Sequence, residues 1–189
     1  MIMTQSRGWH SRGYLPHFDS PEATQFVTFR LADSLPKAVA QALGHREHEV
    51  HRIEGELDEG FGACWLRQPN IATLVQDALL HFDGERYRLL GWCLMPNHVH
   101  VVIEMLEAHS LSDIVRSWKT FTARLANTEL GRQGAFWHAD YFDRYMRDEQ
   151  HFLQTLDYVE SNPVKAGLAQ MPADWMWSSA RHRVLGENA

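Results

Sequence analysis

The stretch RYRLLGWCLMPNHVHVVIEM, residues 86–105, predicts a β-hairpin and decides the fold. Two runs rich in apolar and β-branched residues, Arg86–Met95 and His98–Met105, read as strands. Pro96 cannot donate to a strand ladder and Asn97 tolerates turn geometry, so the chain is expected to reverse between the two runs.

The second run places two histidines on one face of its strand. Side chains alternate between the faces of a strand, so the apolar core face is formed by Val99, Val101 and Ile103. His98, His100 and Glu104 share the outer face, and the two histidine Cα atoms are about 6.6 Å apart. Both imidazoles could bind one divalent ion if a third ligand were supplied. Zinc, manganese or no metal would each satisfy this pattern, and two polar residues on a half-solvated sheet are the alternative.

Elements on both sides of the hairpin complete the expected fold. Upstream, residues 24–31 read as a strand, a helix-like region runs from Pro36 to about Glu59, and a helix spans 70–82 with Asn70 as its cap. Downstream, the chain predicts a helix from Ser110 or Ser112 to about Asn127, an extended segment at 136–147, and a helix at 149–162 that Pro163 ends.

This order of elements predicts an α+β fold, in which an antiparallel sheet packs its helices on one face. The 189 residues suit one domain over the whole chain, with a helical elaboration at about 36–82 and a tail at about 169–189 that packs back on the body.

Composition excludes several classes of protein. No apolar run approaches the ~20 residues that cross a bilayer, and the N-terminus has no signal-peptide pattern, so a cytoplasmic protein with no membrane partner is expected. Two cysteines cannot build a disulfide framework or a four-thiolate zinc site. A net charge of −6 argues mildly against nucleic-acid binding, but residues 111–147 hold six basic residues against four acidic ones, so a local basic surface remains possible.

A second stretch carries a polar stripe on the last long helix. Gln154, Tyr158 and Asn162 are four residues apart and therefore share one helix face, while Phe152 and Val159 belong to an apolar face. The side-chain oxygen of Asn162 could serve as a hard metal ligand. The alternative is a packed tyrosine and an asparagine that caps the helix.

Taken together, LMPNHVHVVIE (94–104) and YVESNPVKAGL (158–168) resemble the single-tyrosine transposases with a His-hydrophobic-His motif, and among these the REP-associated tyrosine transposases. Further stretches are similar to the same group, and the resemblance covers most of the chain from about Gly13. They are GYLPH (13–17), QFVTFRLADSLP (25–36), GAFWHADYFDRYMRDEQHF (134–152) and DWMWSSA (174–180). The resemblance implies a ferredoxin-like or RNA-recognition-like sheet, the HUH nuclease fold, with the histidines on a central strand.

The resemblance also implies roles for individual residues. Tyr158 becomes the nucleophile that cleaves single-stranded DNA and forms a 5′-phosphotyrosine. The implied substrate is DNA with hairpin-forming repeats. His98 and His100 become ligands of Mg²⁺ or Mn²⁺, and Asn162 the third ligand, where some relatives carry glutamine. Glu104 shares the histidine face and could tune a ring or a bound water, although a solvated carboxylate at the strand end is the ordinary alternative. Gln154 is the other candidate for such an outer role.

Candidates for the DNA-binding surface are basic and aromatic residues, because single strands are held by phosphate contacts and base stacking. These candidates are Arg12, Tyr14, Lys119, Trp137, Arg144 and Lys165. Packing in the core, pairing with a nearby aspartate and simple solvation are the alternatives for Trp137, Arg144 and Lys165.

Two other functions remain open from the sequence. One is a non-catalytic module that binds single-stranded nucleic acid and keeps a vestigial metal site. The other is a metal-dependent phosphodiesterase that uses water as its nucleophile. Relatives work as monomers or as dimers that exchange the tyrosine helix, and the resemblance to the REP-associated group favours a monomer.

Overall fold

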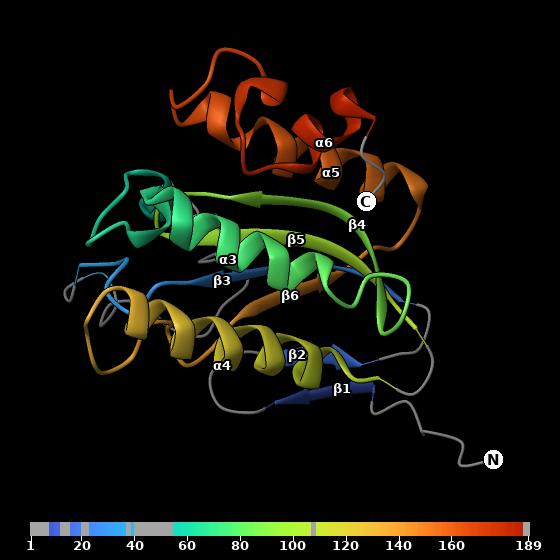
Figure 1. The fold of residues 1–189 in the computed structure, drawn as a ribbon. Helices are drawn as coiled ribbons and strands as arrows, with labels where there is room; N and C mark the ends of the chain where they lie inside the picture. The colour runs from blue at the N-terminus through green and yellow to red at the C-terminus, as the bar shows by residue number, and fades with distance from the viewer. Residues whose placement is uncertain are drawn as a thin grey trace.

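The computed structural model describes residues 8–11, 16–19, 23–36, 39, 55–106 and 109–186, and its centre is a four-stranded antiparallel sheet (Figure 1). The strand order is β4-β5-β3-β6. The strands are β3 (Thr24–Arg30), β4 (Tyr87–Leu94), β5 (His98–Met105) and β6 (Phe142–Tyr145). The predicted hairpin is confirmed, since β4 pairs with β5 and the Met95 amide donates to the His98 carbonyl at 2.9 Å.

Two helices connect these strands and cover one face of the sheet. They are α3 (Pro69–Leu80), between β3 and β4, and α4 (Leu111–Glu129), between β5 and β6. The chain order βαββαβ, with β5 and β3 in the centre, is the ferredoxin-like arrangement. The expected fold class is therefore confirmed, with the histidine strand in a central position.

The main apolar core lies between the sheet and the two connecting helices. It includes Val99, Val101 and Ile103 of β5 together with Val75, Leu79 and Trp118 of the helices. Ser110 caps α4 by accepting a hydrogen bond from the Asp113 amide. The alternation read from β5 is thus correct, and the histidines project from the opposite face.

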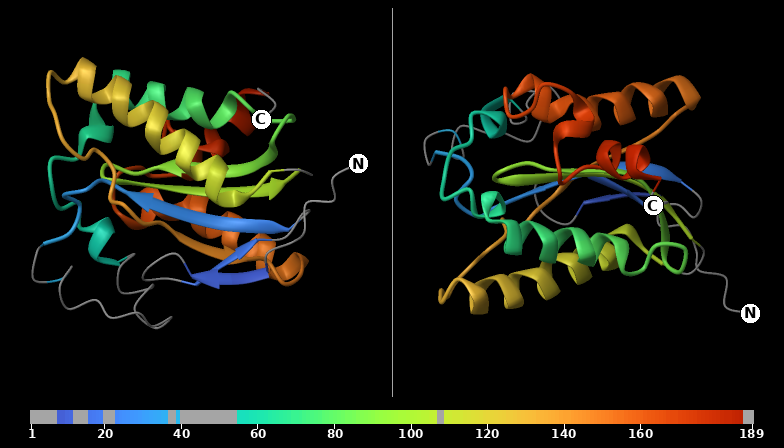
Figure 2. Two further views of the ribbon diagram at one scale, coloured as in Figure 1. Left: turned by 90° about the horizontal axis from the view of Figure 1, so that it is seen from below. Right: turned by 45° about the horizontal axis from the view of Figure 1, so that its top comes forward.

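That opposite face is covered by the C-terminal part of the chain (Figures 1 and 2). Helix α5 (Glu149–Lys165) crosses it, followed by the short helices η3 (Pro172–Asp174) and α6 (Ser179–Leu185). A second, smaller apolar cluster forms beneath α5 around Phe26, Val102 and Val159. The α3–α4 layer and the α5–α6 layer therefore enclose the sheet from both sides.

Helix α5 does not end at Pro163, contrary to the sequence prediction. Pro163 lies inside the last turn, and the helix ends at Lys165, two residues before Gly167, which has a left-handed φ of 69°. The Gly167 amide donates to the Val164 carbonyl and the Leu168 amide to the Pro163 carbonyl, a Schellman ending. A proline near the end of a helix removes one backbone hydrogen bond only, so this glycine sets the boundary. Asn162 is consequently a helix residue and not a cap.

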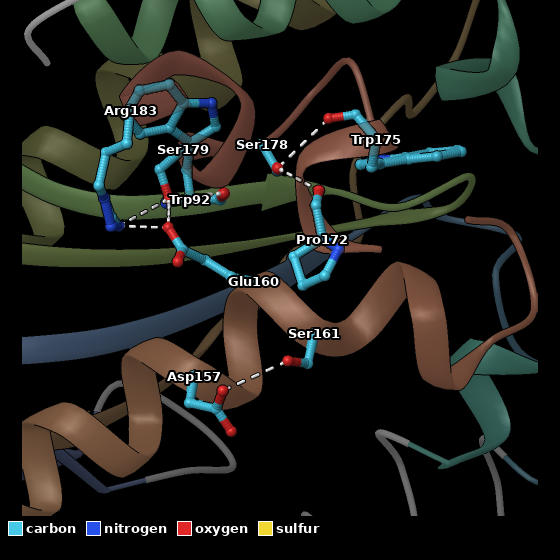
Figure 3. Close-up of polar contacts among 9 residues, drawn as sticks. All are labelled: Trp92, Asp157, Glu160, Ser161, Pro172, Trp175, Ser178, Ser179 and Arg183. Carbon is cyan, nitrogen blue, oxygen red and sulfur yellow. Dashed lines mark hydrogen bonds and ion pairs between the residues drawn. The ribbon is translucent and has the colours of Figure 1, made fainter. Parts of the chain in front are cut away.

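Two features hold α5 close to β4. Gly91 follows an irregularity in the β4 ladder, and a Cβ atom added there would overlap Cδ1 of Leu156 on α5. At the C-terminal end, Ser179 Oγ accepts from the Trp92 amide at 3.1 Å and bonds Glu160, which also pairs with Arg183 (Figure 3). The predicted packing of the tail on the body is confirmed by these contacts, which fix the helix that carries Tyr158.

One smaller prediction is wrong, one lies mostly outside the described residues, and one element was not predicted. Gln68 precedes α3 and Asn70 lies in its first turn, with Pro69 at the start, so Asn70 is not the cap. The region from Pro36 to Glu59 falls mostly outside the described residues, which include a helical segment at 55–58. A two-stranded ribbon of β1 (Gly8–Ser11) and β2 (Pro16–Asp19) was not predicted.

Within the ranges that the structure describes, no helix combines the length and the apolar character that a membrane span requires.

Candidate active site

The two histidines of β5 meet in a fully buried position between the sheet and α5. Both side chains are 0% exposed, and their Nε2 atoms lie 3.0 Å apart. The alternative of two polar residues on a half-solvated sheet is therefore wrong, because α5 covers this part of the sheet. The two imidazoles stay outside the main core, and His100 stacks on Phe26 of the smaller cluster beneath α5.

Asn97 fixes the orientation of the first imidazole. Its Nδ2 donates to the Phe61 carbonyl at 3.0 Å, which leaves its Oδ1 facing His98 Nδ1 at 2.8 Å. An amide oxygen only accepts, so His98 carries its proton on Nδ1 and presents a lone pair on Nε2. Asn97 was read from the sequence as a turn residue, but it also sets the tautomer of a candidate ligand.

Thr28 and Asn162 hold the second imidazole. Thr28 lies opposite His100 on β3, and its Oγ1 is 2.8 Å from His100 Nδ1. Asn162 Nδ2, from α5, lies 3.1 Å from His100 Nε2. If the amide donates, His100 also presents a lone pair on Nε2, so two lone pairs face each other across 3.0 Å.

Burial keeps both rings neutral. It lowers the pKa of His100 to about 3, and burial together with the neighbouring His100 holds the pKa of His98 well below its usual value. A neutral imidazole is the form that binds a metal. The pair is thus ready to bind a cation at neutral pH without first losing a proton.

Asn162 adds a candidate oxygen ligand to this pair. Its Oδ1 is buried and has no hydrogen-bond partner among the residues that the structure describes. A spacing of 3.0 Å between two nitrogens also fits adjacent octahedral ligands at about 2.1 Å from one ion. In the same described part, no three His, Cys, Asp or Glu side chains are already arranged around a metal position. A third protein ligand would therefore come from the Asn162 amide oxygen or from a side chain that moves.

Tyr158 lies directly beside this pair, in the same chain. Its ring is 5.6 Å from the His100 ring and 6.1 Å from the Phe26 ring, both in edge-on arrangements. Lys165, two turns later on α5, places its Nζ 4.8 Å from the centre of the Tyr158 ring. The structure thus brings together the four residues that the sequence singled out: His98, His100, Tyr158 and Asn162.

Two charged residues near the pair were missed in the sequence. Asp58 Oδ1 lies 3.7 Å from His98 Nε2. Arg30 is opposite His98 in the β3–β5 register, so it lies on the histidine face, where its side chain donates to Ser34 Oγ at 3.2 Å. The alternation of QFVTFRL does place Thr28 and Arg30 on one face, but only the strand pairing shows that this face is the one with the histidines.

Other predicted site residues lie away from the pair. Trp137 is 5% exposed and donates to Thr122 in the main core, so it cannot stack on a base, contrary to the prediction. Lys119 lies on α4, across the sheet, and donates to the Ala139 carbonyl at 2.8 Å. Glu104 binds Arg88 at the far end of β5, and Gln154 is exposed on α5.

The remaining candidates for DNA contacts divide into two groups. Arg144 lies opposite Phe26 on β6 and hence on the histidine face, and Lys165 is exposed beside Tyr158. Arg12 and Tyr14 fall outside the described residues.

Comparison with known families finds one match that spans all four of the candidate site residues. Residues 71–162 match the family model for IS200-like transposases, and this span includes both histidines, the tyrosine and the asparagine.

Individual relatives agree with this match. A protein of Haemophilus influenzae assigned to the REP-associated tyrosine transposases is 29% identical over 111 residues, covering 53% of this chain and 63% of the relative. The REP-associated tyrosine transposase of Escherichia coli is 21% identical over 107 residues, covering 56% of this chain and 62% of the relative. The chain thus matches less than two thirds of the length of each.

A solved structure shares the fold. It is that of a REP-associated tyrosine transposase bound to a REP hairpin, with a TM-score of 0.58 at 16% identity, covering 92% of this chain and 86% of the other. At this identity the likeness establishes the fold alone.

Proposed function

We propose that the protein is a transposase that cleaves and rejoins single-stranded DNA through Tyr158, because residues 71–162 match the family model for IS200-like transposases. The observation that carries the proposal is the position of the Tyr158 ring, 5.6 Å from His100, whose Nε2 faces His98 at 3.0 Å. A nucleophile and a pair of neutral metal-binding side chains thus meet in one chain, on a helix and a strand that pack against each other.

Tyr158 is the proposed nucleophile. Its phenolic oxygen forms a bond to the scissile phosphorus while the bond from phosphorus to the 3′-oxygen breaks. The phenol loses its proton to solvent, and the 3′-oxygen leaves as a hydroxyl. The 5′-phosphotyrosine that results keeps the phosphodiester bond energy for rejoining, so the strand can be transferred without another energy source.

His98, His100 and Asn162 would hold the divalent cation. Two imidazoles and an amide oxygen suit Mn²⁺, and also Mg²⁺ if water fills the other positions. When bound, such a cation polarises a non-bridging phosphate oxygen and orients the phosphate for attack. Asn97 and Thr28 contribute by holding the two rings with their Nε2 atoms toward the shared position.

Basic side chains on the histidine face are the proposed contacts to the DNA backbone. Arg30 and Arg144 come from neighbouring strands of the sheet, and Lys165 comes from the end of α5. We propose hairpin-forming repeats as the substrate, because one relative of this fold is solved with a REP hairpin. The net charge of −6 then reflects the rest of the surface.

DNA can reach this site only after a local opening. Both imidazoles are 0% exposed, and the Tyr158 hydroxyl is buried as well. A phosphate must contact all three groups, so substrate binding has to move α5 or the segment at 55–66 away from the sheet. The tyrosine and the histidines lie in one chain, which favours a monomer that acts in cis over a dimer that exchanges α5.

Cleavage of a labelled single-stranded hairpin in the presence of Mn²⁺ tests this function. Wild-type protein should give a covalent protein–DNA species on a denaturing gel. Tyr158→Phe should lose that species and keep DNA binding, whereas the matched variant Tyr145→Phe should behave as wild type. Cleavage by both wild type and Tyr158→Phe would indicate a water-dependent phosphodiesterase instead. Binding without cleavage by wild type would indicate a non-catalytic module.

A further inference from the structure

A carboxylate from the acidic stretch before α3 lies close to the first of the two histidines. Asp58 lies at the end of the helical segment at 55–58, and its Oδ1 is 3.7 Å from His98 Nε2. Its side chain is 28% exposed, so the carboxylate is mostly withdrawn from solvent. The family match begins at residue 71 and therefore does not include this residue.

The position of Asp58 is fixed by contacts on its own segment. Leu57 is 1% exposed, and the Phe61 carbonyl accepts from Asn97 Nδ2 at 3.0 Å. The Leu66 amide then donates to the Pro96 carbonyl at 3.2 Å. Asn97 also orients His98, so the segment that carries Asp58 and the first imidazole are joined through one side chain.

The distances allow Asp58 and the histidines to share an ion. Two ligands about 2.1 Å from one cation lie at most about 4.2 Å apart. The His98–His100 distance of 3.0 Å and the Asp58–His98 distance of 3.7 Å are both shorter than this limit. The Asn162 amide comes from α5 to the same pair, with its Nδ2 3.1 Å from His100 Nε2, and its buried Oδ1 lacks a hydrogen-bond partner in the described ranges.

We propose that Asp58 is an oxygen ligand of the divalent cation held by His98, His100 and Asn162. This inference rests on the proposed function and deepens it, because it adds a protein ligand to the same site. The two imidazoles and the amide are neutral, so Asp58 supplies the negative charge that strengthens binding of a divalent ion. Asp58 Oδ1 lies 3.7 Å from His98 Nε2, so the proposed role requires its side chain to turn toward the shared position when the cation binds.

Titration of the full chain with MnCl₂ by calorimetry tests the inference. Asp58→Asn keeps the size of the side chain and removes the charge, so it should weaken Mn²⁺ binding at least tenfold. Glu59→Gln removes the same charge from the next, exposed residue and should leave binding unchanged. Thermal unfolding in EDTA shows that each variant is folded, and Asp58→Ala provides a second variant that cannot coordinate.

The outcomes separate this inference from the proposed function. Equal Mn²⁺ affinity in wild type, Asp58→Asn and Asp58→Ala, with binding lost in His98→Ala, would overturn the role of Asp58 and leave the histidine site intact. Wild-type protein that binds no Mn²⁺ would overturn both the ligand role and the cation site. Failure of the proposed chemistry appears instead as the absence of a covalent adduct at Tyr158, whatever the titrations give.

Discussion

The ring of Tyr158 lies 5.6 Å from the ring of His100, although one residue belongs to a C-terminal helix and the other to a central strand. Both side chains also contact Phe26, whose ring stacks on His100 at 5.4 Å and meets Tyr158 edge-on at 6.1 Å. Tyr158 is therefore held against the histidine pair by packing within one chain. This arrangement has consequences that mutations can test.

Replacement of Asn162 should change cation binding in a direction that depends on the new side chain. Asn162→Ala removes the amide oxygen and is expected to weaken Mn²⁺ binding about tenfold or more, a loss typical of removing a metal-site partner. Asn162→Asp supplies a charged oxygen on a side chain of the same length and should bind Mn²⁺ at least as tightly as wild type. Calorimetry with MnCl₂ measures both.

The partly exposed residue Ser161, which bonds only Asp157 among the contacts in Figure 3, provides a control for these variants. Ser161→Ala should bind Mn²⁺ as wild type does. If Asn162→Ala also kept the wild-type affinity, Asn162 would not be a ligand.

Gly91→Ala should impair catalysis by moving α5. The added methyl group would overlap Cδ1 of Leu156, and we expect α5 to shift to relieve this overlap and so displace Tyr158 from the histidines. A displacement of about 1 Å can reduce a reaction rate by as much as ~100-fold, so we expect a loss of about tenfold or more in the cleavage rate. The double variant Gly91→Ala/Leu156→Ala should recover much of this loss. A slow single variant that Leu156→Ala does not rescue would argue against displacement of the helix.

Tyr87→Phe should reduce stability without affecting the site. The Tyr87 hydroxyl donates to the Leu79 carbonyl at 2.6 Å and accepts from Trp118 Nε1 at 2.9 Å, all in the main core. Its loss leaves two buried polar groups without a partner, which costs about 1–3 kcal/mol. Urea unfolding measures the free energy of unfolding, and a change below ~0.5 kcal/mol would contradict this reading of the hydroxyl.

The sequence predicts the local geometry of this protein well, because local geometry follows from periodicity. The alternation around His98 and His100 and the four-residue spacing of Tyr158 and Asn162 define the correct faces. The end of α5 was misjudged, since Pro163 is a strong signal but Gly167 makes the hydrogen-bonded ending. Asparagine in a turn and proline near a helix end each allow two structures, and packing chooses between them.

Contacts between distant segments could not be predicted. Asp58 is one of many acids in its stretch, and only the folded chain places it beside His98. The same applies to Trp137, which the sequence offered as a base-stacking residue and which fills the core against Phe29. Hydrophobic aromatic residues suit either environment, so composition alone does not separate them.

His138 should make the protein less stable in mild acid. Burial, and then the nearby Arg30, lowers the pKa of His138, and its Nδ1 accepts from the Asp140 amide at 3.3 Å, which only the neutral ring can do. The unfolded chain therefore binds more protons at this residue below the ordinary pKa of about 6.5. The stability that neutral His138 contributes is present above that pH and is lost as the pH falls below it.

Urea unfolding at pH 7.5 and pH 5.5 measures this contribution. Between these two values the free energy of unfolding should fall less in His138→Asn than in wild type, because the variant has no proton to bind there. The exposed His109 serves as the control, and His109→Asn should follow wild type. An equal fall in wild type and His138→Asn would contradict the prediction.

The central claim is that Tyr158 attacks DNA beside the two histidines, and mapping of the covalent adduct by mass spectrometry tests it most directly. Wild-type protein is incubated with a single-stranded hairpin and Mn²⁺, digested with protease and nuclease, and searched for a peptide that carries a nucleotide on a tyrosine. The account predicts one modified peptide, with a 5′-phosphate attached to Tyr158, and none in His98→Ala. A nucleotide attached to another residue, or cleaved DNA with no modified peptide, would contradict it.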